Sequence, residues 1–240
     1  MRARLSRMAP GWNRFVPAFY WGGTHLLRAI LWVVARWVVT GRENVPLSGP
    51  VIVVSNHLSN TDPPILSAAV LRRRVRYMGK IELFRSPLAP VVRLWGAFPV
   101  RRFESDVGAL LAAERILRHG GALGMFPEGH RSRTGSLGMP HPGTAMIALR
   151  SGAPVLPCAI IGTEQLSRPL NVLRRPRITV RIGEPIVLQP VRRPTDQQVS
   201  ELTERIFGEI KSLLPAKYLV AYTGSEGTAA TTHGGDHPGQ

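Results

Sequence analysis

Ser55–Leu66 reads S-N-H-L-S-N-T-D-P-P-I-L, and this stretch joins a predicted strand to a predicted helix. Before it, the β-branched run V-I-V-V-S of residues 51–55 predicts a short buried strand. Near its end, Pro63 and Pro64 begin an apolar run that continues to Leu71. Proline suits the first positions of a helix because these positions make no use of an N–H. We therefore expect His57 where the strand ends and Asp62 where the helix begins, two rigid places from which side chains can be aimed.

A histidine beside a carboxylate forms an acid–base unit. The carboxylate holds one ring nitrogen as N–H and stabilises the imidazolium, while the other nitrogen is left to take a proton from a hydroxyl. A purely structural interpretation fits the same motif. Asp62 before two prolines suits a helix N-cap, and His57 would then be an ordinary loop histidine. The function of the pair has to be judged together with the motifs that follow it.

The length predicts one α/β domain, and the composition predicts that it binds anions. The chain has 240 residues, with 31 Lys or Arg against 15 Asp or Glu and a net charge of +16. So basic a protein binds polyanions, which can be nucleic acid, an anionic membrane surface or a phosphorylated substrate. The single cysteine, Cys158, excludes an intrachain disulfide and a multi-cysteine metal site.

The most apolar part of the chain is residues 15–39, and four of the five tryptophans lie in or beside it. A helix from Thr24 to Thr40 would be about 25 Å long, shorter than the roughly 30 Å hydrocarbon core of a bilayer. Arg28 and Arg36 would each cost about 2.5–3.5 kcal/mol at the bilayer centre. We therefore expect residues 1–40 to form a helical segment that lies at the membrane interface without spanning it. The alternative is a helix packed on the domain core.

The rest of the chain alternates predicted strands and helices. Further strands are expected at 75–79, 96–102, 122–126, 155–161 and 177–182, and further helices at 105–119, 144–151 and 195–214. The four arginines of residues 72–76 are expected on a surface that faces solvent or membrane. Residues 223–240 lack apolar periodicity and are expected to be a disordered tail, so the catalytic domain should span residues 41–222.

Three further blocks follow in order along the chain. They are G-A-F-P-V-R-R from Gly96, F-P-E-G-H-R-S from Phe126 and V-L-P from Val155. F-P-E-G after a strand places a carboxylate, a turn and an arginine at the carboxyl end of that strand, where open α/β sheets bind ligands. Together with His57 and Asp62, these blocks resemble the four ordered blocks of the glycerolipid acyltransferases. The likeness is strongest to the members that make phosphatidic acid from 1-acylglycerol 3-phosphate, and it covers roughly residues 42–190.

The resemblance implies a fold, a location, a reaction and a set of site residues. The fold would be α/β, with a mostly parallel central sheet flanked by helices and an acyl tunnel, and the protein would attach to the cytoplasmic face of the membrane. The reaction would move a fatty acyl group from acyl-CoA or acyl carrier protein to a lysophospholipid hydroxyl. His57 would be the general base and Asp62 its partner. The residues implied near the acceptor or its phosphate are Lys80, Arg102, Glu128, Gly129, His130 and Arg131.

One of these positions departs from the family. His130 stands where threonine is usual, so a small hydroxyl is replaced by a larger ring of a type that titrates near neutral pH. This departure bears on the identity of the acceptor more than on the chemistry.

Other function classes fit part of the sequence. No Gly-x-Ser-x-Gly elbow is present, so a serine acyl-enzyme lacks its usual signal, and the hydroxyl must attack the thioester directly while both reactants are bound. This chemistry requires no metal or redox cofactor. The acceptor can also be glycerol 3-phosphate, another lysophospholipid or a glycolipid. A non-catalytic basic protein on anionic membranes and an esterase or thioesterase are the remaining classes; no nucleic-acid module is recognisable.

Overall fold

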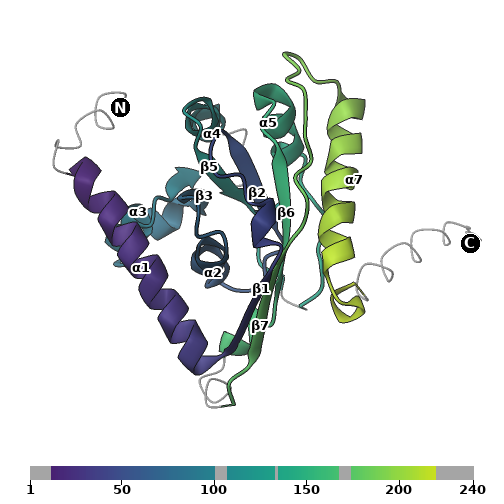
Figure 1. The fold of residues 1–240 in the computed structure, drawn as a ribbon. Coiled ribbons are helices and arrows are strands. Elements are labelled where there is room, and N and C mark those ends of the chain that lie inside the picture. The colour runs from purple at the N-terminus through teal and green to yellow at the C-terminus, as the bar shows by residue number, and fades with distance from the viewer. Residues whose placement is uncertain (1–11, 101–106, 133–134, 168–173, 220–240) are drawn as a thin grey trace, which may run out of the picture.

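The computed structural model of the chain describes residues 12–100, 107–132, 135–167 and 174–219 (Figure 1). The predicted site residue Arg102 and the predicted tail 223–240 lie outside these ranges. Within them the chain forms a seven-stranded sheet with helices on both faces. The strands are β1 (Arg36–Thr40), β2 (Val51–Ser55), β3 (Val75–Lys80), β4 (Phe98–Val100), β5 (Ala122–Met125), β6 (Val155–Ile161) and β7 (Arg177–Ile182). The helices are α1 (Trp12–Val34), α2 (Asp62–Ala69), α3 (Ala89–Leu94), α4 (Val107–Arg118), α5 (Gly143–Ser151) and α7 (Asp196–Leu213).

The sheet is mostly parallel, as the sequence predicts, and its strand order is β1-β7-β6-β2-β5-β3-β4. β2 pairs in parallel with β5 on one side and β6 on the other. β7 runs antiparallel to β6, and β1 runs parallel to β7. The carboxyl ends of β2 to β6 therefore meet at one edge, together with the amino ends of β1 and β7. We call this the carboxyl edge of the sheet, and it is where open α/β sheets bind ligands.

A hydrophobic core covers each face of the sheet. Along β2, Ile52 and Val54 pack into one cluster with residues of α4, α5 and α7. Val51 and Val53 point the other way, into a second cluster that includes residues of α1 and α2. All five residues of β2 are buried, which accounts for its unbroken apolar run. Figure 1 shows the two layers, with α1, α2 and α3 on one side and α5 and α7 on the other.

The N-terminal segment differs from the prediction at its end. The helix stops at Val34, and Arg36–Thr40 form the edge strand β1, so a helical segment that reaches residue 40 is wrong over these last positions. The reason is that R-W-V-V-T is as well suited to a strand as to a helix, and β7 offers it an open edge. α1 is also anchored to the domain, because the buried Tyr20 hydroxyl accepts the N–H of Val75 at 3.1 Å. No helix among the described residues is long and apolar enough to cross a bilayer.

Arg73 corrects the expectation that arginines 72–76 face solvent or membrane. Its side chain is buried, and its guanidinium donates to the carbonyl oxygens of Pro46 at 3.0 Å, Gly49 at 2.5 Å and Gly120 at 2.7 Å. These carbonyls precede β2 and β5, at the edge opposite the carboxyl edge. A guanidinium with five N–H donors suits a place where several loop carbonyls lack strand partners. Arg72, by contrast, is exposed as expected.

Candidate active site

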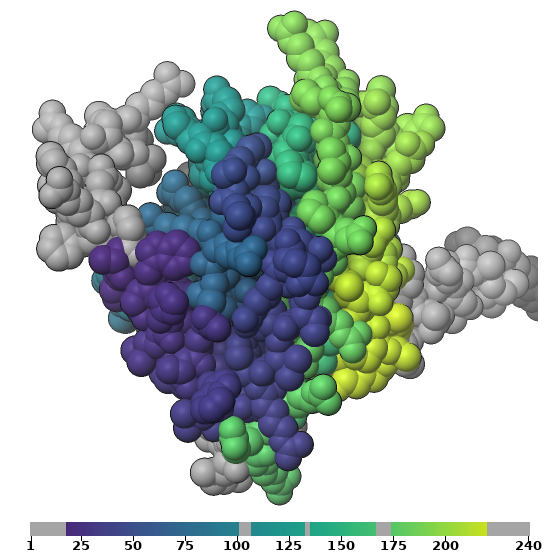
Figure 2. Space-filling model, in the orientation of Figure 1, coloured from purple at the N-terminus to yellow at the C-terminus, as the bar shows by residue number. Residues whose placement is uncertain are grey.

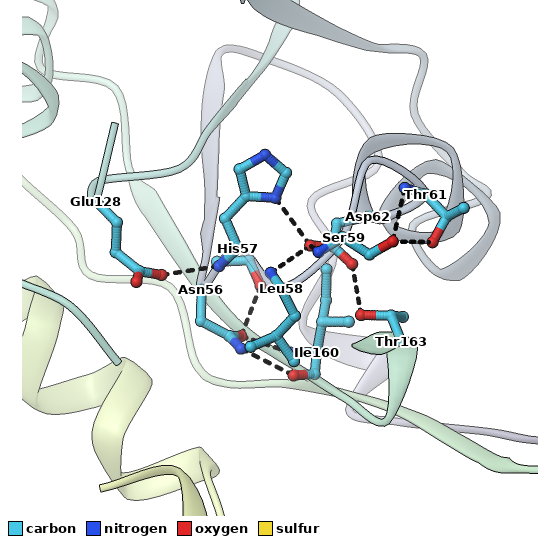
Figure 3. A network of polar contacts seen from close by, with 10 residues as sticks. Asn56, His57, Leu58, Ser59, Thr61, Asp62, Glu128, Ile160 and Thr163 are labelled. Atoms are coloured by element: carbon cyan, nitrogen blue, oxygen red, sulfur yellow. Dashed lines mark hydrogen bonds and ion pairs between the residues drawn. The ribbon is translucent and has the colours of Figure 1, made fainter. Parts of the chain in front are cut away.

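His57 and Asp62 meet at the carboxyl edge (Figure 3). Nδ1 of His57 lies 2.8 Å from Oδ2 of Asp62, and Asp62 is fully buried. The same oxygen accepts the N–H groups of Leu58 at 2.6 Å and Ser59 at 2.7 Å. The N-cap position of α2 is Thr61, whose side chain makes no capping bond. Asp62 therefore organises the His57 loop and orients the imidazole instead of capping the helix.

Thr163 holds the second oxygen of this carboxylate. Its hydroxyl donates to Oδ1 of Asp62 at 2.6 Å, from a fully buried position just after β6. Because the carboxylate already accepts two backbone N–H groups and this hydroxyl, Nδ1 of His57 carries the proton that it donates to Asp62. Nε2 has no hydrogen-bond partner among the residues that the structure describes, and it points away from Asp62 in Figure 3. This nitrogen is the one that can accept a proton from a substrate.

The imidazole is also held from one face by an aromatic ring. Phe126, which directly follows β5, stacks on His57 with 4.2 Å between ring centroids and 20° between planes. Tyr77 of β3 stacks in turn on Phe126 at 6.1 Å. Gly124 permits this arrangement, since a Cβ there would lie 2.2 Å from Cε1 of Tyr77. The ring that bears the candidate base is therefore fixed by a hydrogen bond at one atom and by packing on one face.

Glu128 binds the backbone of His57. One of its oxygens accepts the N–H of His57 and the other the N–H of Gly138, both at 2.8 Å. The N–H of Ser132 donates to the carbonyl of His57 at 2.8 Å, so the loop after β5 holds both backbone groups of the histidine. Burial raises the pKa of Glu128, and the two N–H groups offset part of that rise. Both oxygens of Glu128 are thus used to position the loop and His57.

Asn56 extends the sheet by one step beyond the end of β2. Its side-chain oxygen accepts the N–H of Ile160 at 2.8 Å, and its side-chain nitrogen donates to the carbonyl of the same residue at 2.9 Å. These two bonds replace the backbone ladder at the point where His57 leaves the strand. Sequence reasoning missed Asn56 and Thr163, because neither has a sequence signal that names its partner; the sheet register brings those partners close.

The other predicted residues that the structure describes lie on or near the same edge, whereas Arg102 is outside the described ranges. Gly129 has φ +69°, and a Cβ there would lie 2.8 Å from Cδ2 of His141, so only glycine fits without a shift. His130 and Arg131 are exposed on the loop after Glu128, and Lys80 is exposed at the end of β3. The structure thus brings His57, Asp62 and Glu128 into one network and leaves the side chains of His130, Arg131 and Lys80 open to solvent. No cluster of His, Cys, Asp or Glu within the described ranges has the arrangement of a metal site.

Comparison with known proteins gives the same family that the motifs resemble. A family model described as "Acyltransferase" matches residues 36–161, which contain His57, Asp62 and Glu128. The 1-acyl-sn-glycerol-3-phosphate acyltransferase of Borreliella burgdorferi is 31% identical over 141 residues, or 57% of this chain and 56% of the relative. A chloroplastic relative from Brassica napus is 30% identical over 62% of this chain and 44% of its own length. The chain thus spans about half the length of these relatives.

A relative from Bacillus subtilis, also a 1-acyl-sn-glycerol-3-phosphate acyltransferase, aligns over 92% of its length at 26% identity. Among solved structures, the 1-acyl-sn-glycerophosphate acyltransferase of Thermotoga maritima is similar, with 27% identity and a TM-score of 0.62. That match covers 90% of this chain and 86% of the other. The resemblance drawn from the motifs is therefore confirmed, and this chain belongs to the acyltransferase family.

Proposed function

We propose that this acyltransferase moves a fatty acyl group from an acyl thioester to the free hydroxyl of 1-acylglycerol 3-phosphate, and so makes phosphatidic acid. The observation that carries the proposal is the imidazole of His57. A buried carboxylate that accepts three further hydrogen bonds orients it at Nδ1, and Nε2 has no hydrogen-bond partner among the described residues. The names of the relatives support this choice of acceptor. The donor would be acyl-CoA or acyl carrier protein.

In the proposed reaction, Nε2 of His57 takes the proton of the acceptor hydroxyl while its oxygen attacks the thioester carbonyl carbon. The tetrahedral intermediate then collapses, the C–S bond breaks, and the leaving sulfur receives the proton from the imidazolium. Asp62 stabilises that imidazolium through Nδ1–H. General-base catalysis of this kind contributes about 10²–10⁴-fold in rate. Holding both reactants at the carboxyl edge lowers the barrier further by proximity.

The acceptor phosphate would be bound by the loop after β5. Arg131 is exposed and directly precedes Ser132, whose N–H holds the carbonyl of His57, so the arginine starts one residue from a fixed point beside the base. A guanidinium can grip two phosphate oxygens at once. Arg102, Lys80 and His130 are further candidates for this phosphate. Glu128 and Gly129 would shape the pocket by fixing the loop.

α1 would dock the enzyme on the membrane surface. Phe19, Leu26, Ile30 and Val33 are 40%, 63%, 45% and 66% exposed, and their spacing places them on one face of the helix. An exposed apolar face of this kind on a chain of charge +16 suits the interface of an anionic membrane. We therefore propose a peripheral or monotopic protein at the cytoplasmic face of the cell membrane.

Incubation of the purified protein with acyl-CoA and 1-acylglycerol 3-phosphate tests the proposal. Phosphatidic acid and free thiol should form in equal amounts, and parallel reactions with glycerol 3-phosphate and lysophosphatidylcholine should be much slower. Thiol without ester would indicate hydrolysis, and ester made only from another acceptor would overturn the choice of 1-acylglycerol 3-phosphate.

A further inference from the structure

A cleft of about 300 Å³ lies at the junction of α1 and β1, apart from the candidate active site. It is lined by Trp32, Ala35, Arg36, Trp37, Val38 and Arg175. The end of α1 and the starts of β1 and β7 are at the bottom of Figure 1, and Figure 2 shows the surfaces of α1 (purple) and of the β7 start (green) meeting there. β1 and β2 are separated by β7 and β6, so the cleft is about 14 Å from β2 across three strand spacings.

Two arginines line this cleft, and two more lie beside them in the chain or in the sheet. Arg36 and Arg177 are register partners in β1 and β7, and Arg174 and Arg175 precede Pro176, the residue before β7. All four are exposed, and none forms an ion pair with another described residue. Like charges placed opposite each other in a sheet are unfavourable, because nothing offsets their repulsion. An anion bound at this place would remove that cost.

The cleft also holds donors that are fixed in direction. Nη2 of Arg175 donates to the carbonyl of Trp32 at 3.0 Å, which pins the guanidinium at the end of α1. Arg175 adopts φ +47°, a left-handed conformation that an arginine rarely takes. Nε1 of Trp37 is buried and has no acceptor among the described residues. A buried N–H without a partner is costly, and an acceptor oxygen in the cleft would satisfy it.

We infer that this cleft binds the phosphate group of an anionic phospholipid of the membrane, at a site separate from the one that binds the acyl acceptor. Guanidinium forks and an indole N–H are donors for phosphate oxygens, which match them in charge and geometry. The lipid source follows from Trp32, which lines the cleft and is 74% exposed, because exposed tryptophan side chains favour the membrane interface. The inference concerns equilibrium binding and does not depend on which acceptor is acylated.

Binding of the full-length protein to vesicles tests the site. The vesicles contain phosphatidylcholine with or without phosphatidylglycerol, a phosphodiester that is neither substrate nor product of the proposed reaction. We expect Arg36→Ser/Arg175→Asn to weaken partition onto phosphatidylglycerol vesicles by about 30-fold, the loss expected for two cations at an anionic surface. Asparagine at position 175 accommodates the positive φ. The matched control, Arg192→Ser/Arg193→Ser, removes the same charge from the exposed segment before α7, at the top of Figure 1, and should change partition less than about 3-fold.

Arg36→Lys/Arg175→Lys distinguishes a specific phosphate site from charge attraction alone. It keeps both charges but removes the guanidinium groups that can donate two hydrogen bonds to one phosphate. We expect this pair to weaken partition by about 5–10-fold and to abolish competition by soluble short-chain phosphatidylglycerol. Inorganic phosphate at the same concentration should compete poorly. Parent-like binding by the lysine pair would overturn the site, equal loss in the control pair would reduce it to net charge, and equal competition by inorganic phosphate would overturn the lipid assignment.

Discussion

At the scale of single residues, the carboxylate of Asp62 is the centre of the candidate site. It accepts from four donors: Nδ1 of His57, the N–H groups of Leu58 and Ser59, and the hydroxyl of Thr163. The spacing of His57 and Asp62 could be read from the sequence because a short loop must bring them together. Thr163 could not, since it lies 101 positions from Asp62 and reaches it only through the register of β6 beside β2.

Thr163→Val tests whether this hydroxyl positions the acid–base pair. Valine keeps the shape but removes a donor to a charged group, a bond that contributes roughly 1.5–3 kcal/mol. We expect kcat to fall by about 10-fold or more with acceptor KM little changed, because an oriented carboxylate matters most when the imidazolium forms. Thr163→Ser restores the hydroxyl and should recover most of the rate. If the serine variant is as slow as the valine variant, the hydroxyl is not what matters.

Arg131→Ala tests the proposed phosphate contact. Loss of a charge-assisted hydrogen bond should raise the acceptor KM by about 10–150-fold and leave the donor KM nearly unchanged. Arg118→Ala, an exposed arginine at the end of α4 on the opposite edge, is the matched control and should behave as the parent. A similar acceptor KM in Arg131→Ala and the parent would remove Arg131 from the site.

At the scale of elements, most strands and helices of the domain could be predicted. Helix α3 was not predicted, and the N-terminal segment was predicted only in part. Apolar runs bounded by glycine and proline gave β2, β5 and β6 close to their observed bounds, because buried parallel strands read as unbroken apolar stretches. β1 could not be separated from the helix before it, since its five residues carry the same apolar composition. Its pairing with β7 is a tertiary contact, which a local sequence pattern cannot predict.

The exposed apolar face of α1 should bind the membrane surface. Leu26→Gln/Ile30→Gln should reduce partition onto phosphatidylcholine–phosphatidylglycerol vesicles by at least about 10-fold, because burying one such side chain is worth about 1.5–3 kcal/mol. Leu47→Gln/Val187→Gln alters side chains that are 70% and 76% exposed elsewhere, and it should leave partition unchanged. Both variants should keep their activity on water-soluble substrates. Equal loss of binding in the two double variants would contradict docking through α1.

At the scale of the whole molecule, one sheet separates two cores and gathers the functional groups at a single edge. The sequence predicts an α/β fold with a mostly parallel sheet through its resemblance to a family, and the directions of the strand pairs agree. The antiparallel pairing of β7 with β6 could not be predicted, because it depends on which strand edge the folded sheet leaves unpaired. The burial of Arg73 could not be predicted either, because it depends on which loop carbonyls lack a strand partner.

The reactivity of Cys158 with a thiol reagent measures whether the sheet is folded. It lies in β6 with no exposed surface, and burial raises the pKa of its thiol, so little thiolate forms in the folded protein. Raising the pH from 7 to 9 should therefore accelerate labelling by a thiol reagent only in the denatured protein. Labelling of the native protein should follow its unfolding as denaturant is added. Rapid labelling of the native protein would mean that the centre of the sheet opens locally.

Product formation by His57→Ala in the presence of acyl-CoA and 1-acylglycerol 3-phosphate tests whether His57 is the catalytic base. Phosphatidic acid and thiol are followed together, with circular dichroism and vesicle binding as checks that the variant is folded and still docks. We predict that the rate falls by about 10²–10⁴-fold while both checks match the parent. The rate of Asp62→Asn should fall nearly as far, because asparagine keeps the side-chain shape but loses the charge and replaces one acceptor oxygen with an NH2 donor. A folded His57→Ala variant that makes phosphatidic acid within a few-fold of the parental rate would show that His57 is not the catalytic base.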